Sequence, residues 1–188
     1  MVRGATGLMT GAGNPSAAIN LVRKRPLAEQ KVTLTGAAGS WDDYRGEVDA
    51  SSPLNDSGTL RGRVVTSYRD ANSFIDNVEE DHGLFYAVTE ADLSEDTTLG
   101  FAVSQSNGES RGNIRGLPRY ADGRMPDVSR STYTGARWNR SEIDVTTLYA
   151  DLEHRFNEDW AFKVGAVQMT EDNQAKNQRT QSPGGLLP

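Results

Sequence analysis

Glycines gather at the start of the chain, and a glycine-rich loop is one way for a protein to hold a phosphate group. A dinucleotide fingerprint requires G-x-G-x-x-G, and a P-loop requires G-x-x-x-x-G-K-[ST]. Gly11 and Gly13 supply one G-x-G pair, but Ser16 stands at the third glycine position and no Lys-Ser or Lys-Thr follows. The Asn-Pro dipeptide after Gly13 favours a turn over the start of a helix. The glycines therefore do not predict a nucleotide site.

Histidine and the carboxylates also point away from catalysis. The chain has no Cys, and its two histidines, His82 and His154, are expected in a loop and near a turn, without the spacing of a metal site. The acids of residues 76–81 could gather a cation, although a solvated loop is the interpretation that we favour. Asp151 and Glu153 form a carboxylate pair, but such pairs recur along every predicted strand. Repetition of this kind indicates a wetted interior, so we do not expect an enzyme.

The composition is unusual for a compact soluble domain. Of 188 residues, 36% are hydrophobic and 19 are glycine, and the mean hydropathy is -0.62, so few apolar residues are available for burial in each element. The sequence offers no run of about 18 apolar residues for a membrane helix and no stretch that resembles a signal peptide. Transmembrane strands carry apolar residues only at alternate positions, so they escape hydropathy windows and stay possible.

Charge divides the chain into two parts. Residues 1–31 hold five basic residues and one acid, a balance of +4, so the remaining residues carry -10 of the total charge of -6. A basic head on an acidic body suggests two structural units. It also makes nucleic acid an unexpected partner for the body.

Alternation of apolar and polar residues dominates the chain after Pro26. In one such segment Leu60, Gly62 and Val64 share one side, while Arg61 and Arg63 share the other. This period of two predicts β-strands with one charged face. Seven segments qualify, and the first is the weakest: residues 31–42, 44–54, 60–69, 85–93, 99–104, 148–156 and 160–166.

The predicted connections are of two kinds, and their distribution suggests a fold. Tight polar turns are expected at residues 55–58, 94–97 and 157–159, and a medium and a long loop are expected at about 70–82 and 107–140. Short turns at one end and mostly long loops at the other are typical of outer-membrane barrels. A soluble β-sandwich also alternates, but its strands are shorter and its inner face is apolar. The pattern favours a membrane barrel.

The opening block "RGATGLMTGAGNPSAAINLVRKRP" resembles the end of the plug domain of TonB-dependent outer-membrane ferric-siderophore receptors, particularly the ferripyoverdine and hydroxamate-siderophore type. The segments "GSWDDYRGEVDASSPLNDSGTLRGRVV", "RSTYTGARWN" and "LEHRFNEDW" also resemble this group, so the resemblance covers essentially the whole chain. The positions of the block that match the family pattern are Arg3, Gly4, Gly11, Pro15, Asn20, Arg25 and Pro26.

The resemblance implies an all-β fold: a partial transmembrane antiparallel β-barrel, about seven strands of a plugged 22-stranded barrel, preceded by the C-terminal part of the plug. Residues 1–30 would belong to the plug and residues 31–188 to the barrel. The chain then looks like a fragment that alone neither inserts stably nor transports, because an open sheet edge is not tolerated in hydrocarbon. A non-transporting barrel, or a secreted β-rich binding or adhesion module, is the competing interpretation.

The family function implied is uptake of ferric siderophores across the bacterial outer membrane. The expected partners are the ferric siderophore, outer-membrane lipid, and the TonB–ExbB–ExbD system, which would act through a segment missing from this chain. No cofactor is expected, since iron enters only as part of the ligand.

Two groups of residues are candidates for this function. Ligand contacts would come from the glycine-rich loop and the long loop, although loop packing or interface anchoring explains each residue as well: Leu8, Met9, Thr10, Gly11, Asn14, Arg119, Tyr120, Tyr133 and Trp138. Basic plug residues could pair with barrel acids and hold the plug until energy input loosens it; general solvation of a wet interior is the alternative. The proposed bases are Arg3, Arg23, Lys24 and Arg25, and the acids are Glu47, Asp49, Glu90 and Asp92.

Overall fold

The computed structural model describes residues 2–3, 17–18, 22–112, 116–117, 119–177 and 186–187, and its regular elements within these ranges are all strands. Seven strands are long: β3 (Lys31–Gly39), β4 (Asp43–Pro53), β5 (Leu60–Asn72), β6 (Glu79–Ser94), β7 (Thr97–Arg111), β9 (Arg140–Arg155) and β10 (Ala161–Lys176). Four have two residues each: β1 (Val2–Arg3), β2 (Ala17–Ala18), β8 (Arg119–Tyr120) and β11 (Leu186–Leu187). Within the described part of the chain, no helix is long and apolar enough to cross a membrane.

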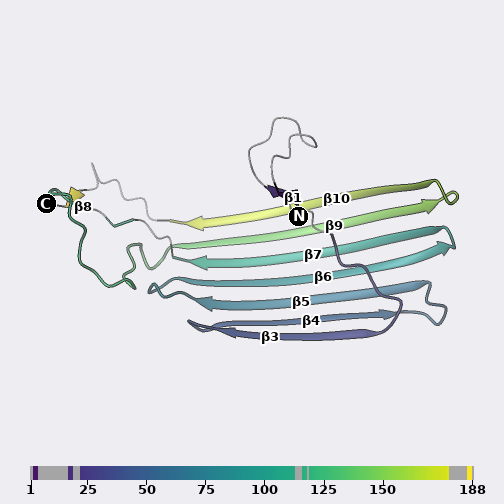
Figure 1. Ribbon diagram of the computed structural model, residues 1–188, viewed down its shortest axis with the longest axis horizontal. Coiled ribbons are helices and arrows are strands. Elements are labelled where there is room, and N and C mark those ends of the chain that lie inside the picture. Colours follow the sequence, from purple (N-terminus) through teal and green to yellow (C-terminus); the bar gives the residue numbers. More distant parts are fainter. Residues whose placement is uncertain are drawn as a thin grey trace.

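The long strands form one antiparallel meander. Their order is β10-β9-β7-β6-β5-β4-β3, so every strand lies beside its neighbour in the chain, apart from the short β8 (Figure 1). β1 pairs with β2, and β8 pairs with β11 in parallel. The prediction of an all-β antiparallel sheet with seven strands is therefore confirmed.

The strands extend further than alternation predicted. β6 begins at Glu79 instead of residue 85, β9 begins at Arg140 instead of residue 148, and β10 continues to Lys176 instead of ending at residue 166. Near these ends both faces of the sheet are polar, so the sequence pattern disappears while the ladder of backbone hydrogen bonds continues. β6, β9 and β10 each have 16 residues, more than the roughly 9–11 that a tilted transmembrane strand needs. The excess lies at the end of the sheet with the long loop (Figure 1).

The register gives the sheet two different faces. On one face Val64 lies opposite Ala87, Ala87 opposite Val103, and Val103 opposite Leu148. On the other face, Arg61 lies opposite Glu90, Glu90 lies opposite Gly100, and Gly100 lies opposite Asp151. We call the first, apolar side the outer face and the second, charged side the inner face. Phe101 and Leu148 on the outer face are 54% and 50% exposed, so this apolar surface has no cover within the described residues.

Burial is concentrated on the inner face. The core cluster consists of Val65, Tyr86, Val88 and Ala102, with the partly buried Tyr149 packed against it. These residues come from four neighbouring strands, β5, β6, β7 and β9. The cluster lies where the segment that leads into β3 crosses the sheet (Figure 1).

Both edge strands, β3 and β10, have a partner on one side only among the described residues. Neighbouring strands alternate in direction, and seven is an odd number, so β3 and β10 run the same way. These two edges cannot pair with each other in an antiparallel ladder, either within one chain or in a ring of equally oriented copies. We therefore expect the 188-residue chain alone to form no closed barrel. We also expect it not to insert stably into a membrane, because open sheet edges are not tolerated in hydrocarbon.

Reconstitution into lipid vesicles tests this prediction. The purified chain should show no difference in gel migration between heated and unheated samples, and the vesicles should take up no ferric siderophore. A heat-modifiable, siderophore-transporting species made from this chain alone would contradict it.

Candidate functional site

Residues 22–27, which we call the strap, cross the inner face of the sheet before the chain enters β3 (Figure 1). Three consecutive basic side chains of the strap form ion pairs with three different strands. Arg23 Nη2 lies 2.6 Å from Asp151 Oδ2 on β9, and Lys24 Nζ lies 2.7 Å from Asp49 Oδ2 on β4. Arg25 Nε lies 2.5 Å from Glu90 Oε1 on β6. The strap therefore connects strands that are far apart in the chain.

The backbone of the strap is held as well. The Tyr86 hydroxyl donates to the Lys24 carbonyl at 2.9 Å, and Arg63 Nη1 donates to the Arg25 carbonyl at 2.9 Å. The Leu27 amide donates to Ser51 Oγ at 2.8 Å. Pro26 between them is buried. A proline has no amide proton, so its burial leaves no unsatisfied donor.

The acids under the strap are also paired within the wall. Arg63 binds both carboxylate oxygens of Asp49, at 2.7 and 2.6 Å. Such a fork-to-carboxylate arrangement is among the stronger ion pairs. Arg61 Nη2 lies 3.9 Å from Glu90 Oε2, and Arg61 Nη1 lies 2.6 Å from Asp92 Oδ2. The strap thus joins an existing network of charges.

Hydrogen bonding to Asp49 raises the pKa of Lys24 above its ordinary 10.5, and hydrogen bonding to Glu90 raises the pKa of Arg25. A raised pKa of a base stabilises the folded state below the ordinary pKa, and this stabilisation is lost only as the pH rises through the folded value. The loss therefore falls in the alkaline range. In neutral and acidic solution both strap residues stay charged.

Sequence reasoning located the strap charges but not all of their partners. Glu47, Asp49 and Glu90 do lie within ion-pair distance of strap residues. Asp92 does not, because Arg61 occupies it, and the partner of Arg23 is Asp151. Asp151 was missed as a partner because it follows Arg23 by 128 positions, and only the strand order brings the two together.

Arg23 also lies over the ring of Tyr149, 4.2 Å from the centroid. Such a cation–π contact stabilises an Arg that is partly exposed to water. The backbone of Arg3 belongs to β1, and its predicted contact with a barrel acid stays a prediction.

The long-loop candidates for ligand contact are not brought into one site. Arg119 Nη1 donates to the Gly123 carbonyl within its own loop, at 3.4 Å. The Tyr133 hydroxyl donates to the Ala136 carbonyl at 3.0 Å. Tyr120 lies 5.9 Å from the Arg124 guanidinium, whereas Trp138 is 59% exposed. The plug candidates lie outside the described residues: Leu8, Met9, Thr10, Gly11 and Asn14.

Three other side chains meet near the long loop, and sequence reasoning missed them. The rings of Trp41 and Phe74 lie 6.0 Å apart, and Arg130 lies 5.1 Å from the Phe74 ring. The Asp76 amide donates to the Ser131 carbonyl at 2.9 Å, so the β5–β6 connection and the long loop are joined. Trp41 has a φ of 60°, a conformation that is costly for a bulky residue. The Trp in a short turn was the only signal of this cluster in the sequence.

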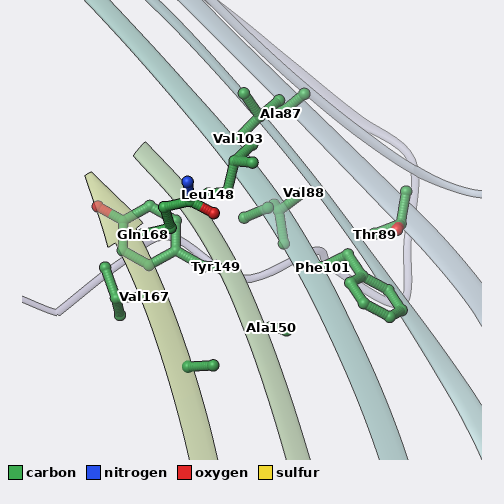
Figure 2. A pocket seen from close by; sticks show the side chains of 12 residues that line it. Ala87, Val88, Thr89, Phe101, Val103, Leu148, Tyr149, Ala150, Val167 and Gln168 are labelled. Carbon is green, nitrogen blue, oxygen red and sulfur yellow. The ribbon is translucent and has the colours of Figure 1, made fainter. Parts of the chain in front are cut away.

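The outer face carries a shallow apolar depression of about 560 Å³. Figure 2 shows its lining, which comes from β6, β7, β9 and β10 and includes Val103, Leu148 and Ala150. Its lining contains no charged side chain.

The described residues contain no group of three or more His, Cys, Asp or Glu side chains that could hold a metal ion.

Known proteins match the chain closely. It is 42% identical over 167 residues to the ferric-pyoverdine M114 receptor of Pseudomonas sp. strain M114, and 42% identical over 172 residues to the ferripyoverdine receptor of Pseudomonas aeruginosa. The chain is homologous to a segment of the ferripyoverdine receptors. The alignments cover 89% and 90% of the chain but 20% and 21% of these receptors. The chain thus spans about a fifth of the length of the curated relatives it matches. No protein-family model matches it.

A solved ferripyoverdine receptor also has this fold. The crystal structure of the receptor of the Pseudomonas aeruginosa outer membrane, bound to ferripyoverdine, superposes with a TM-score of 0.85 at 38% identity. The superposed segment covers 97% of this chain and 25% of the receptor chain. The match confirms the predicted similarity to a segment of ferripyoverdine receptors, the fold class and the outer-membrane location. The boundary between residues 30 and 31 and the ligand contacts stay predictions.

Proposed function

We propose that this chain forms part of the wall, and the end of the plug, of a receptor that takes up ferric siderophores across the bacterial outer membrane. The observation that carries the proposal is the strap. A charged segment tied to three strands of the inner face is expected where a plug enters a barrel, and it has no use in a barrel whose interior is empty. The homology with ferripyoverdine receptors supports the same function.

The remaining parts of the proposal follow from the two faces of the sheet. The outer face would contact outer-membrane lipid, because its middle is apolar and uncovered. Energy would come from the TonB–ExbB–ExbD system acting on the plug. Ligand contacts would include the glycine-rich loop and the exposed Trp138, as predicted from the sequence.

A chimera tests the function. Residues 22–177 would replace the corresponding strands of the Pseudomonas aeruginosa ferripyoverdine receptor, in cells that lack their own copy. We expect the chimera to take up radioactive iron from ferric pyoverdine at a rate comparable to that of the parent receptor. The matched control is the parent receptor with that segment deleted. A chimera that folds in the outer membrane but takes up no iron would overturn the proposal and favour a non-transporting barrel or a binding module.

Trp138→Ala in this chimera is expected to weaken ferric-siderophore binding by about 1–3 kcal/mol, since exposed aromatic anchors often dominate a binding surface. Trp160→Ala is the matched control, because Trp160 is exposed in the β9–β10 turn, whereas Trp138 precedes the start of β9 at the other end of that strand. Titration of ligand fluorescence measures both affinities. Equal affinities for the two variants would remove Trp138 from the ligand contacts.

A further inference from the structure

The strap lies over the core cluster of the inner face. Val88, 7% exposed, and Tyr86 line one cavity with Val22, Arg23, Lys24 and Arg25 of the strap region. Val65 and Tyr149 line a second cavity with Arg23 and Lys24. Lifting the strap would therefore open the cluster to water. Exposure of buried apolar area is costly.

Two kinds of contact hold the strap: ion pairs that are partly exposed to water, and hydrogen bonds of the strap backbone. The strap cations are partly exposed, with 38%, 46% and 54% of the Arg23, Lys24 and Arg25 side chains accessible. Solvent screens such ion pairs, so each contributes little alone. The strap backbone accepts hydrogen bonds from Tyr86 and Arg63 and donates one to Ser51. These bonds are part-buried or adjoin the wall network, and they do not depend on the strap side chains. Of the three wall residues, Tyr86 and Ser51 are buried, at 9% and 4% exposure, so their hydrogen bonds to the strap exchange with water only if the strap lifts away.

We propose that the strap is a permanent part of the wall, so that it stays on β4, β5, β6 and β9 while ligand passes. Tyr86, Arg63 and Ser51 are the positioning residues that hold the strap in this place. The inference rests on the proposed transport function, and it excludes release of the strap as the opening step.

Cysteine labelling in the chimera tests whether the strap leaves the wall. The chain has no Cys of its own, and the rest of the receptor would be made cysteine-free. Val88→Cys places a thiol beneath the strap. His82→Cys is the matched control on the same strand and the same face, because His82 is exposed and lines neither cavity beneath the strap. A hydrophilic maleimide is added to resting cells and to cells that are taking up ferric pyoverdine.

We expect Val88→Cys to label at least about tenfold more slowly than His82→Cys, equally at rest and during uptake, since labelling of a buried thiol requires local opening. Labelling of Val88→Cys that accelerates only during uptake would overturn the proposal. Rapid labelling at rest would overturn it as well, because the strap would then not cover Val88. Denatured receptor, in which both thiols must react, shows that each variant can be labelled.

A cross-link gives an independent readout. Leu27→Cys combined with Ser51→Cys replaces a strap–wall hydrogen bond with a disulfide. Oxidised receptor should keep its uptake rate, whereas loss of uptake that reductant restores would show that the strap must move. If the chimera without cysteine substitutions takes up no iron, both the proposed function and the proposal of a permanent strap fail. If the chimera takes up iron but Val88→Cys labels faster during uptake, only the proposal of a permanent strap fails.

Discussion

Val103→Arg is expected to destabilise the receptor wall by about 2–4 kcal/mol, the cost of a cation on the lipid-facing side of a barrel near mid-depth. Val103 lies on the outer face, opposite Ala87 on one side and Leu148 on the other. An Arg there would have to reach water across its apolar neighbours. Guanidinium unfolding of the purified chimera in lipid vesicles measures the change.

Ser106→Arg is the matched control, because Ser106 is on the same strand but on the inner face. Its hydroxyl lies 3.0 Å from His82 Nε2, so the control loses one exposed hydrogen bond and is expected to cost about 1 kcal/mol or less. Equal destabilisation by the two substitutions would mean that the outer face does not contact lipid, and it would contradict the assignment of the faces.

Arg25→Glu has the second large expected effect. It places a carboxylate beside Glu90, whose side chain is 9% exposed and whose remaining partner is Arg61 at 3.9 Å. We expect a loss of about 1–3 kcal/mol, less than for a fully buried pair because the Arg25 side chain is half exposed. Guanidinium unfolding curves of the purified chimera measure the effect.

A second substitution separates charge from packing. Glu90→Gln in the Arg25→Glu chimera removes the repulsion between the two carboxylates and should recover part of the stability. Glu90→Arg is unsuitable, because the new guanidinium would be repelled by Arg61. Arg124→Glu is the matched control, since the ion pair of Arg124 is with Asp122 in an exposed loop, away from the strap. No recovery with Glu90→Gln, or an equal effect of Arg124→Glu, would show that the Arg25–Glu90 pair does not hold the strap.

Much of the sheet could be predicted from alternation, and its limits have a physical cause. The predicted segment at 60–69 lies within β5, because Leu60 and Arg61 already begin an apolar face and a charged face. The start of β6 was placed too late, since Glu79 and Glu80 are both polar and carry no period. Alternation predicts a strand only where one face is apolar, so it gives no prediction where both faces of the strand are polar.

The site was predicted less completely than the sheet. The bases at 23–25 are visible as a charge run before Pro26, and acids are visible on every strand. Which acid meets which base depends on register and strand order, so Asp49 was found and Asp151 was not. Tyr86 gave no signal, because a Tyr within an alternating strand is compatible with packing, interface anchoring or hydrogen bonding.

The strap also constrains the order in which the molecule can assemble. Lys24 meets Asp49 after a separation of 25 residues, Arg25 meets Glu90 after 65, and Arg23 meets Asp151 after 128. Since short loops close at a lower entropic cost than long ones, the strap should first attach to β4. It would then gain β6, and finally β9, as each strand joins the meander. The strap would thus be fully secured only after β9, the strand most distant from it in the chain among its three ion-pair partners, has joined the sheet.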